Sequence, residues 1–304
     1  MISAILVPIV LAGGFGSSGA ALTRRMPPAT AVRLLTPLAV IVAAGTGFAL
    51  TAVAILAGAQ LPGVARAGAW SPSAIHQALP LPVGFGALAG TAVLILLGAA
   101  VARVCRTVLA MRRSVAAVRR LAGDGGGNLV VVSDPRPTAF AVPGLHGRVV
   151  VSRSLLRSLD AEERRALLAH EWAHLRYRHH LYLILAGAAA AANPLLRPVT
   201  RALATSVERW ADETAADAVG DRAVVARSLA RAALARTTAG PGGLAAAAHA
   251  VPQRVAALLA DRPTLKRGWP LFAMGYGLAV LVAAGWTAWS VHQIIETAEA
   301  VYLH

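Results

Sequence analysis

The chain has 304 residues, of which 57% are hydrophobic and 14% are charged. Soluble domains are usually about half apolar and about a quarter charged, so the shortage of charge excludes an ordinary soluble globule. The high hydrophobicity also excludes a disordered chain. Because the apolar residues lie in long blocks, the composition indicates a membrane protein.

The net charge of +15 is unevenly placed along the chain. Only four of the 29 Lys and Arg residues precede residue 103, and the other 25 lie between Arg103 and Arg267. Basic segments beside apolar spans are typical of cytoplasmic membrane faces. No basic run is interleaved with aromatic residues, so we expect no nucleic-acid partner.

Four apolar segments are long enough to cross a bilayer, which takes roughly 20 residues. They cover residues 1–22, 34–61, 81–102 and 269–291. The basic loops place the N-terminus outside and the long middle region inside. We therefore expect three parts: an N-terminal membrane region (1–122), a cytoplasmic unit (123–267), and a C-terminal span with a short outer tail (268–304).

A fifth apolar segment, Leu181–Leu196, is only 16 residues long and ends in Asn193-Pro194. Arg176 and Arg178 precede it, and further arginines follow it. A single crossing would leave one of these basic groups on the outer side, so the pattern favours a buried or membrane-dipping helix.

The cytoplasmic unit begins after a glycine-rich linker, Gly123–Asn128, and combines short strands with helices. Asp160 followed by Glu163 has the spacing of a capping box and marks the start of a helix. The predicted strands are Leu129–Ser133, Thr138–Val142 and Arg148–Ser152. The predicted helices run from Ala161 to about His180, from Thr200 to Ala218, from Ala223 to Arg236, and onward from Pro252.

His170-Glu171-Trp172-Ala173-His174 is an H-E-x-x-H motif inside the first of these helices. At 3.6 residues per turn the two histidines share one face, so both can bind one Zn²⁺. Glu171 is placed to take a proton from water as a general base. The motif therefore predicts a zinc-dependent hydrolase.

A catalytic zinc usually has three protein ligands, and the third must come from elsewhere in the chain. Glu208 and Asp212 are four residues apart on a predicted helix, so one could bind zinc while the other holds a histidine. On spacing alone, Glu213 and Asp217 would serve equally well. In either case the ligand must lie on the same side of the membrane as His174.

The stretches A-H-E-W-A-H-L-R-Y-R-H-H and V-E-R-W-A-D-E-T-A-A-D resemble the membrane metallopeptidases of the BlaR/MecR type. They are similar, more distantly, to the HtpX and CAAX prenyl protease group. The resemblance implies a mostly helical membrane protein with a zincin-like (gluzincin) α+β unit. It implies zinc ligands His170, His174 and Glu208, with Asp212 beside them. It also implies a substrate-binding edge strand that includes Thr138, Ala139, Phe140 and Ala141.

The chain departs from these families in two respects. No extracellular sensor domain is expected after the last span. The late His-Pro and Arg pattern of the HtpX group is only loosely matched, by His249 and Arg254, which we consider as possible transition-state stabilisers. We expect His179 and His180 to lie at the membrane interface, His146 in a surface turn and Cys105 in a buried position. Tyr177 could face the site or pack against the fold.

These features favour an integral-membrane zinc endopeptidase in a bacterial plasma membrane. By resemblance, the substrate would be a cytosolic repressor or another regulatory or membrane protein. The alternatives are quality control of damaged membrane proteins, as in the HtpX group, and a non-catalytic signalling scaffold that binds zinc. The intact Glu171 argues against the scaffold, because hydrolysis requires this carboxylate and metal binding does not.

Overall fold

The computed structural model describes residues 2–122, 127–144, 147–238, 244–266 and 268–303; side chains 121, 122, 237, 238 and 244–250 are outside the described part. In this part, four helices are long and apolar enough to cross a membrane. They are α1 (Ile2–Arg25), α2 (Pro28–Gly58), α5 (Val83–Ala122) and α12 (Gly268–Leu303). The predicted class, a mostly helical membrane protein with four apolar spans, is confirmed.

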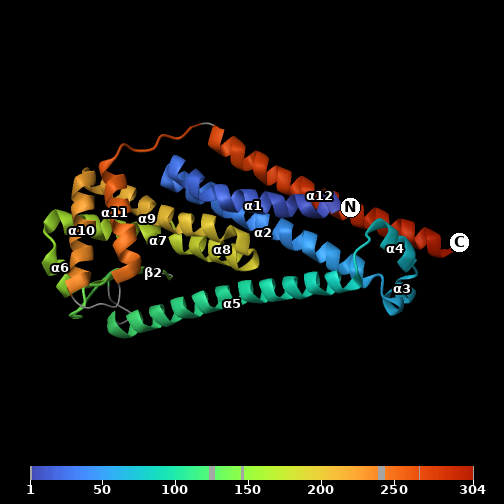
Figure 1. Ribbon diagram of the computed structural model, residues 1–304. Helices are drawn as coiled ribbons and strands as arrows, with labels where there is room; N and C mark the ends of the chain where they lie inside the picture. The colour runs from blue at the N-terminus through green and yellow to red at the C-terminus, as the bar shows by residue number, and fades with distance from the viewer. Residues whose placement is uncertain (1, 123–126, 145–146, 239–243, 267, 304) are drawn as a thin grey trace.

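The two ends of the helix bundle carry different structures (Figure 1). At one end, the predicted outer loop forms two short helices, α3 (Pro62–Gly68) and α4 (Pro72–Ala78). They lie beside the C-terminal part of α12, where the Ser71 N–H donates to the Ala298 carbonyl at 2.9 Å. The small sheet and its neighbouring helices lie at the opposite end.

Helix α5 connects the bundle to the sheet. Its 40 residues extend about 60 Å at about 1.5 Å per residue, which is twice the roughly 30 Å of a bilayer core. The helix therefore continues well past the predicted end of the span at Ala102, and Val118 packs against sheet residues Val130 and Val150. Cys105, which was expected to be buried, is exposed, because little of this part of α5 is covered by other helices.

The fifth apolar segment forms half of a helical hairpin. Helix α8 (His179–Ala192) has 14 residues, about 21 Å, and is too short to cross a bilayer. The chain turns at Asn193 through the short helix η1 (Pro194–Leu196) into α9 (Arg197–Val219). The buried Asn193 amide donates to Thr46 Oγ1 at 3.1 Å, near the middle of α2. The hairpin tip therefore lies about halfway along the spans, with its polar side chain paired as an apolar environment requires.

Two glycines of α1 allow this hairpin to approach closely. A Cβ atom at Gly16 would lie 2.0 Å from the Leu195 carbonyl oxygen, and one at Gly19 would lie 2.3 Å from the Val199 side chain. Small residues at such interfaces are typical of helices packed within membranes. The start of α9 is thus packed tightly against α1.

The sheet contains three strands, at the predicted positions: β1 (Leu129–Val132), β2 (Ala139–Val142) and β3 (Arg148–Ser152). Their order is β1-β3-β2, with β1 parallel and β2 antiparallel to β3. The remaining helices are α6 (Arg153–Ser158), α7 (Ala161–Arg176), α10 (Arg222–Thr238) and α11 (Leu244–Leu259).

Two predicted helix boundaries are wrong. Helix α7 ends at Arg176 rather than near His180, because Arg178 adopts a left-handed conformation with φ 51° and α8 begins directly after it. Pro252 lies inside α11 instead of opening it. The predicted linker at Gly123–Asn128 and His146 lie largely or wholly outside the described residues.

Candidate metal centre

The predicted capping box fixes the start of α7. The Glu163 N–H donates to Asp160 Oδ1 at 2.9 Å, and the Asp160 N–H donates to Glu163 Oε2 at 3.0 Å. The same Glu163 oxygen pairs with Arg231 of α10 at 3.0 Å, and Ser228 of α10 donates to the Glu163 carbonyl. These bonds hold α7 against α10 and set the position of the H-E-x-x-H turn.

His170, His174 and Glu208 converge on one point between α7 and α9. The Nε2 atoms of the two histidines are 3.2 Å apart. The Glu208 carboxylate oxygens lie 3.6 Å from His170 Nε2 and 3.7 Å from His174 Nε2. Among the described residues, these three offer ligand atoms that all lie within 4.8 Å of one another.

These separations fit a zinc ion. Ligands at about 2.0–2.1 Å from a tetrahedral zinc are roughly 3.3–3.4 Å from each other. The three measured separations bracket this range without rearrangement of the helices. Two imidazoles and one carboxylate are also a donor set that zinc prefers.

Asp212 lies behind His170 and is itself held by Arg254 of α11. Asp212 Oδ1 is 3.0 Å from His170 Nδ1. The Arg254 guanidinium donates to both Asp212 oxygens, at 2.6 and 2.8 Å, and lies 3.2 Å from Glu208. Burial raises the pKa of Asp212, but the hydrogen bonds and charges of Arg254 and His170 together outweigh burial and keep the pKa below its usual value. A carboxylate in this position orients His170 with Nε2 toward the metal site.

The two histidines differ in charge when no metal is bound. Burial lowers the pKa of His174 to about 4, so it is neutral and able to offer a lone pair. Burial also lowers the pKa of His170, but hydrogen bonds to Asp212 and Glu208 outweigh it and raise the pKa to about 9. Burial raises the pKa of Glu208, but His170 and Arg254 lower it to about 2. A metal ion would therefore displace one proton, from His170.

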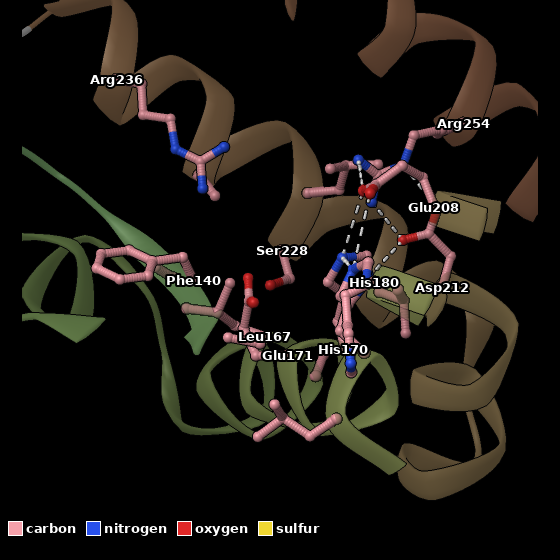
Figure 2. Close-up of a pocket in the computed structure, with 18 of the residues that line it drawn as sticks. Phe140, Leu167, His170, Glu171, His180, Glu208, Asp212, Ser228, Arg236 and Arg254 are labelled. Carbon is pink, nitrogen blue, oxygen red and sulfur yellow. Dashed lines mark hydrogen bonds and ion pairs between the residues drawn. The ribbon is translucent and has the colours of Figure 1, made fainter. Parts of the chain in front are cut away.

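Glu171 faces the cavity beside the three donors (Figure 2). Its side chain is buried, and burial raises the pKa of its carboxyl group. Within the described part of the chain, no hydrogen bond or ion pair occupies this carboxylate. It is thus available to exchange a proton with water or substrate in the cavity.

The cavity has a volume of about 400 Å³ and is bounded on one side by β2. Strand β2 is an edge strand of the sheet, and the Thr138 carbonyl accepts from the Ser152 N–H at 2.8 Å. Pairing alternates along an antiparallel ladder, so the backbone groups of Ala139 and Ala141 face away from β3 toward the open edge. The predicted substrate-binding strand therefore lies beside the candidate metal site, with the backbone groups of Ala139 and Ala141 directed away from β3.

The alternative carboxylates of α9 lie elsewhere. Glu213 pairs with Arg222 at 2.6 Å and with Arg262 at 3.0 Å, and Asp217 pairs with Arg262 at 2.6 Å. Neither contacts the two histidines. Of the two pairs that spacing allows, the structure brings only Glu208 and Asp212 to His170 and His174.

The structure also places the other residues that the sequence analysis considered. Arg254 forms ion pairs with Asp212 and Glu208, while the side chain of His249 lies outside the described residues. Tyr177 packs, with its ring 4.8 Å from that of Trp210. The interface position predicted for His179 is wrong: its side chain is fully buried, because the turn at Arg178 directs it into the fold behind His174.

Two polar residues that line the cavity were not singled out by the sequence analysis. Arg236 of α10 lines the cavity, and Figure 2 shows its guanidinium pointing into it. Ser228 also lines the cavity and ties α10 to α7. Arg236 is one of many arginines in this region, so no local signal separates it from the others.

An H-E-x-x-H helix, a convergent glutamate and an open strand edge, at the end of a bundle of membrane-length helices, form the arrangement expected of a membrane metallopeptidase. Residues 107–189 match the family model described as Peptidase family M48. This region runs from α5 through the sheet and α7 into α8. It includes His170, Glu171 and His174 and ends before Glu208, and it agrees with the resemblance to BlaR- and HtpX-type membrane zinc peptidases. No curated protein and no solved structure matches the chain.

Proposed function

We propose that this protein is a zinc-dependent endopeptidase that cleaves a regulatory or membrane protein at the cytoplasmic face of a bacterial plasma membrane. The observation that carries the proposal is the convergence of His170, His174 and Glu208 at zinc-like separations. The unengaged Glu171 carboxylate beside them supports catalysis over a scaffold that only binds metal.

In the proposed reaction, His170, His174 and Glu208 hold the ion. When bound, zinc acidifies water and polarises the substrate carbonyl group. Glu171 takes the proton from the attacking water and delivers it to the amide nitrogen that leaves. A carboxylate whose pKa is raised by burial holds this proton more readily between the two steps.

The open edge of β2 suits an extended peptide substrate. Ala139 and Ala141 can pair with a substrate backbone, which gives affinity with little dependence on sequence. The hairpin of α8 and α9 places the site close to the spans, so a substrate near the membrane surface is favoured. A cytosolic repressor and a damaged membrane protein both meet these conditions.

The test uses the full chain purified in detergent, with zinc content and cleavage of a dye-labelled unfolded protein as readouts. Glu171→Gln should keep zinc and lose roughly 10²–10⁴-fold in rate, the usual contribution of a general base. Glu208→Gln should lose both zinc and activity. Glu213→Gln is the matched control on the same helix, and it should keep both.

Loss of zinc from Glu213→Gln but not from Glu208→Gln would contradict the ligand assignment. If the wild type binds zinc but cleaves no substrate under any condition tested, the peptidase proposal would give way to the non-catalytic scaffold that binds zinc. An absence of bound zinc in the wild type would overturn the proposal.

A further inference from the structure

His179 contacts the proposed zinc ligand His174 and has no part in the reaction above. It begins α8, directly after the left-handed residue Arg178, and its side chain has no solvent exposure. Its Nδ1 atom lies 3.1 Å from Nδ1 of His174. This contact joins the ring of His179 to the side of the His174 ring that faces away from the metal site.

The two ring nitrogens of His174 point in different directions. Its Nε2 faces His170 and Glu208, so Nδ1 is left for a contact behind the site. An imidazole that donates its Nε2 lone pair to a metal must carry its proton on Nδ1. In the zinc-bound form this N–H therefore donates to Nδ1 of His179.

The opposite direction is incompatible with metal binding. If Nδ1 of His179 were the donor, neutral His174 would have to carry its proton on Nε2, the atom that faces His170 and Glu208. His174 could then offer no lone pair to the ion. The proton of His179 must accordingly lie on its own Nε2, which is buried and has no hydrogen-bond partner among the residues that the structure describes.

This arrangement parallels the one behind His170. There Asp212 lies 3.0 Å from Nδ1 of the ligand, and here a neutral imidazole takes the same position. A buried nitrogen without a hydrogen-bond partner usually destabilises a fold, so an apolar side chain would suit a purely packing role better.

We propose that His179 is a positioning residue that accepts a hydrogen bond from Nδ1 of His174 and so fixes the tautomer and orientation in which His174 binds zinc. The inference rests on the proposed function. It concerns one ligand only, so it can fail while the zinc peptidase stands.

The ring of His179 is held by aromatic contacts rather than by further hydrogen bonds. It stacks on Tyr177 with a centroid separation of 6.0 Å and lies 4.7 Å from Trp210 of α9. Arg33, near the start of α2, places its guanidinium 4.6 Å from the centre of the Trp210 ring. The back of the metal site is therefore braced by a membrane helix.

The test compares three replacements of His179 in the full chain. Asparagine keeps an acceptor near the position of Nδ1, whereas phenylalanine and leucine keep bulk but remove the acceptor. Zinc affinity is measured by competition with a chelator, and the ligand geometry is followed by the absorption spectrum of bound Co²⁺. His292→Leu, on the exposed end of α12, controls for the loss of a histidine as such.

H179F and H179L should weaken zinc binding by roughly 10–100-fold, as loss of a partner behind a metal ligand usually does, and should alter the Co²⁺ spectrum. H179N should stay close to wild type in both. Equal losses in all three variants would mean that the ring only packs, and unchanged affinity in the apolar variants would mean that it does not act on His174. Unfolding of both apolar variants would show a structural role. Each of these three results would overturn the inference about His179. If the wild type still binds zinc, the proposed function remains intact. A wild type without bound zinc would overturn both the inference and the proposed function.

Discussion

Arg254 and Asp212 form a buried charge pair directly behind His170. Removing one partner of such a pair usually costs about 3–5 kcal/mol, because the other charge is left uncompensated. Arg254→Met should therefore lower the free energy of unfolding by about this amount and weaken zinc binding. Adding Asp212→Asn to Arg254→Met should restore part of the stability. Unfolding in detergent, followed by tryptophan fluorescence, measures the free energy of unfolding of the single and the double variant.

The matched control for this experiment is Arg262, which also bridges two carboxylates but is half exposed. Exposed ion pairs are worth at most about 1 kcal/mol, so Arg262→Met should change the unfolding free energy by no more than that. If Arg254→Met behaves like Arg262→Met, the buried pair does not stabilise the site.

Zinc binding should become stronger as the pH rises. Without metal the pKa of His170 is about 9, so below that pH the ion must displace one proton. The pKa values of His174 and Glu208 are about 4 and about 2, so they release no proton above pH 5 or so. Apparent zinc affinity should thus rise about tenfold per pH unit from about pH 5 to about pH 9 and then level off.

Chelator competition across this window measures the slope, and calorimetry in two buffers counts the released proton. Asp212→Asn removes a hydrogen bond that raises the pKa of His170, so it should move the plateau to lower pH. A zinc affinity that is independent of pH would show that His170 is already neutral in the free protein.

At the scale of elements, the edge of β2 makes a prediction about substrate binding. The N–H of Ala141 faces the open edge, so Ala141→Pro removes it without breaking the ladder to β3. Loss of one backbone hydrogen bond, about 0.5–1.5 kcal/mol, should lower kcat/KM by roughly 2–10-fold and leave zinc content unchanged. Ala141→Val, which keeps the N–H, is the control.

Phe140→Pro is the informative comparison, because the N–H of Phe140 points toward β3 and helps to hold the sheet. This variant should lose stability as well as activity. Wild-type activity in Ala141→Pro would mean that the substrate does not pair with β2.

The elements that are set by local signals could be predicted from the sequence. The capping box of Asp160 and Glu163 marks the start of α7, and the β-branched runs mark the three strands. The end of α7 could not be predicted, because the left-handed turn at Arg178 directs Tyr177 and His179 onto Trp210, which comes from α9. Strand order was also out of reach, since it depends on pairing between distant segments.

The candidate metal site also combines features that local sequence signals predict with features that depend on packing between distant segments. The helical period alone brings His170 and His174 to one face. Glu208 and Glu213 are five residues apart and so project from different sides of α9, and the packing of α7 on α9 decides between them. The resemblance to known families, rather than spacing, selected Glu208. His179 could not be recognised, because its burial depends on the turn that precedes it.

At the scale of the whole molecule, the distribution of charge follows the two ends of the bundle. Arg24 and Arg25 end α1 and Arg33 lies near the start of α2, at the same end as the sheet. The opposite end, with α3 and α4, carries Arg66 as its basic residue between the second and third spans. This asymmetry supports the proposal that the sheet and the candidate metal site lie on the cytoplasmic side.

The length of α5 allows this orientation to be tested with the chain's single cysteine removed. In a Cys105→Ala background, Ser73→Cys lies on the exposed surface of α4, and Ser114→Cys lies on the exposed part of α5 beyond the predicted span. A membrane-impermeant maleimide should label Ser73→Cys in intact cells and Ser114→Cys only after permeabilisation. The two serines are matched in size and exposure, so a difference in labelling reports the side of the membrane. Labelling of Ser114→Cys alone in intact cells would invert the topology and place the metal site outside, where a cytosolic repressor could not reach it.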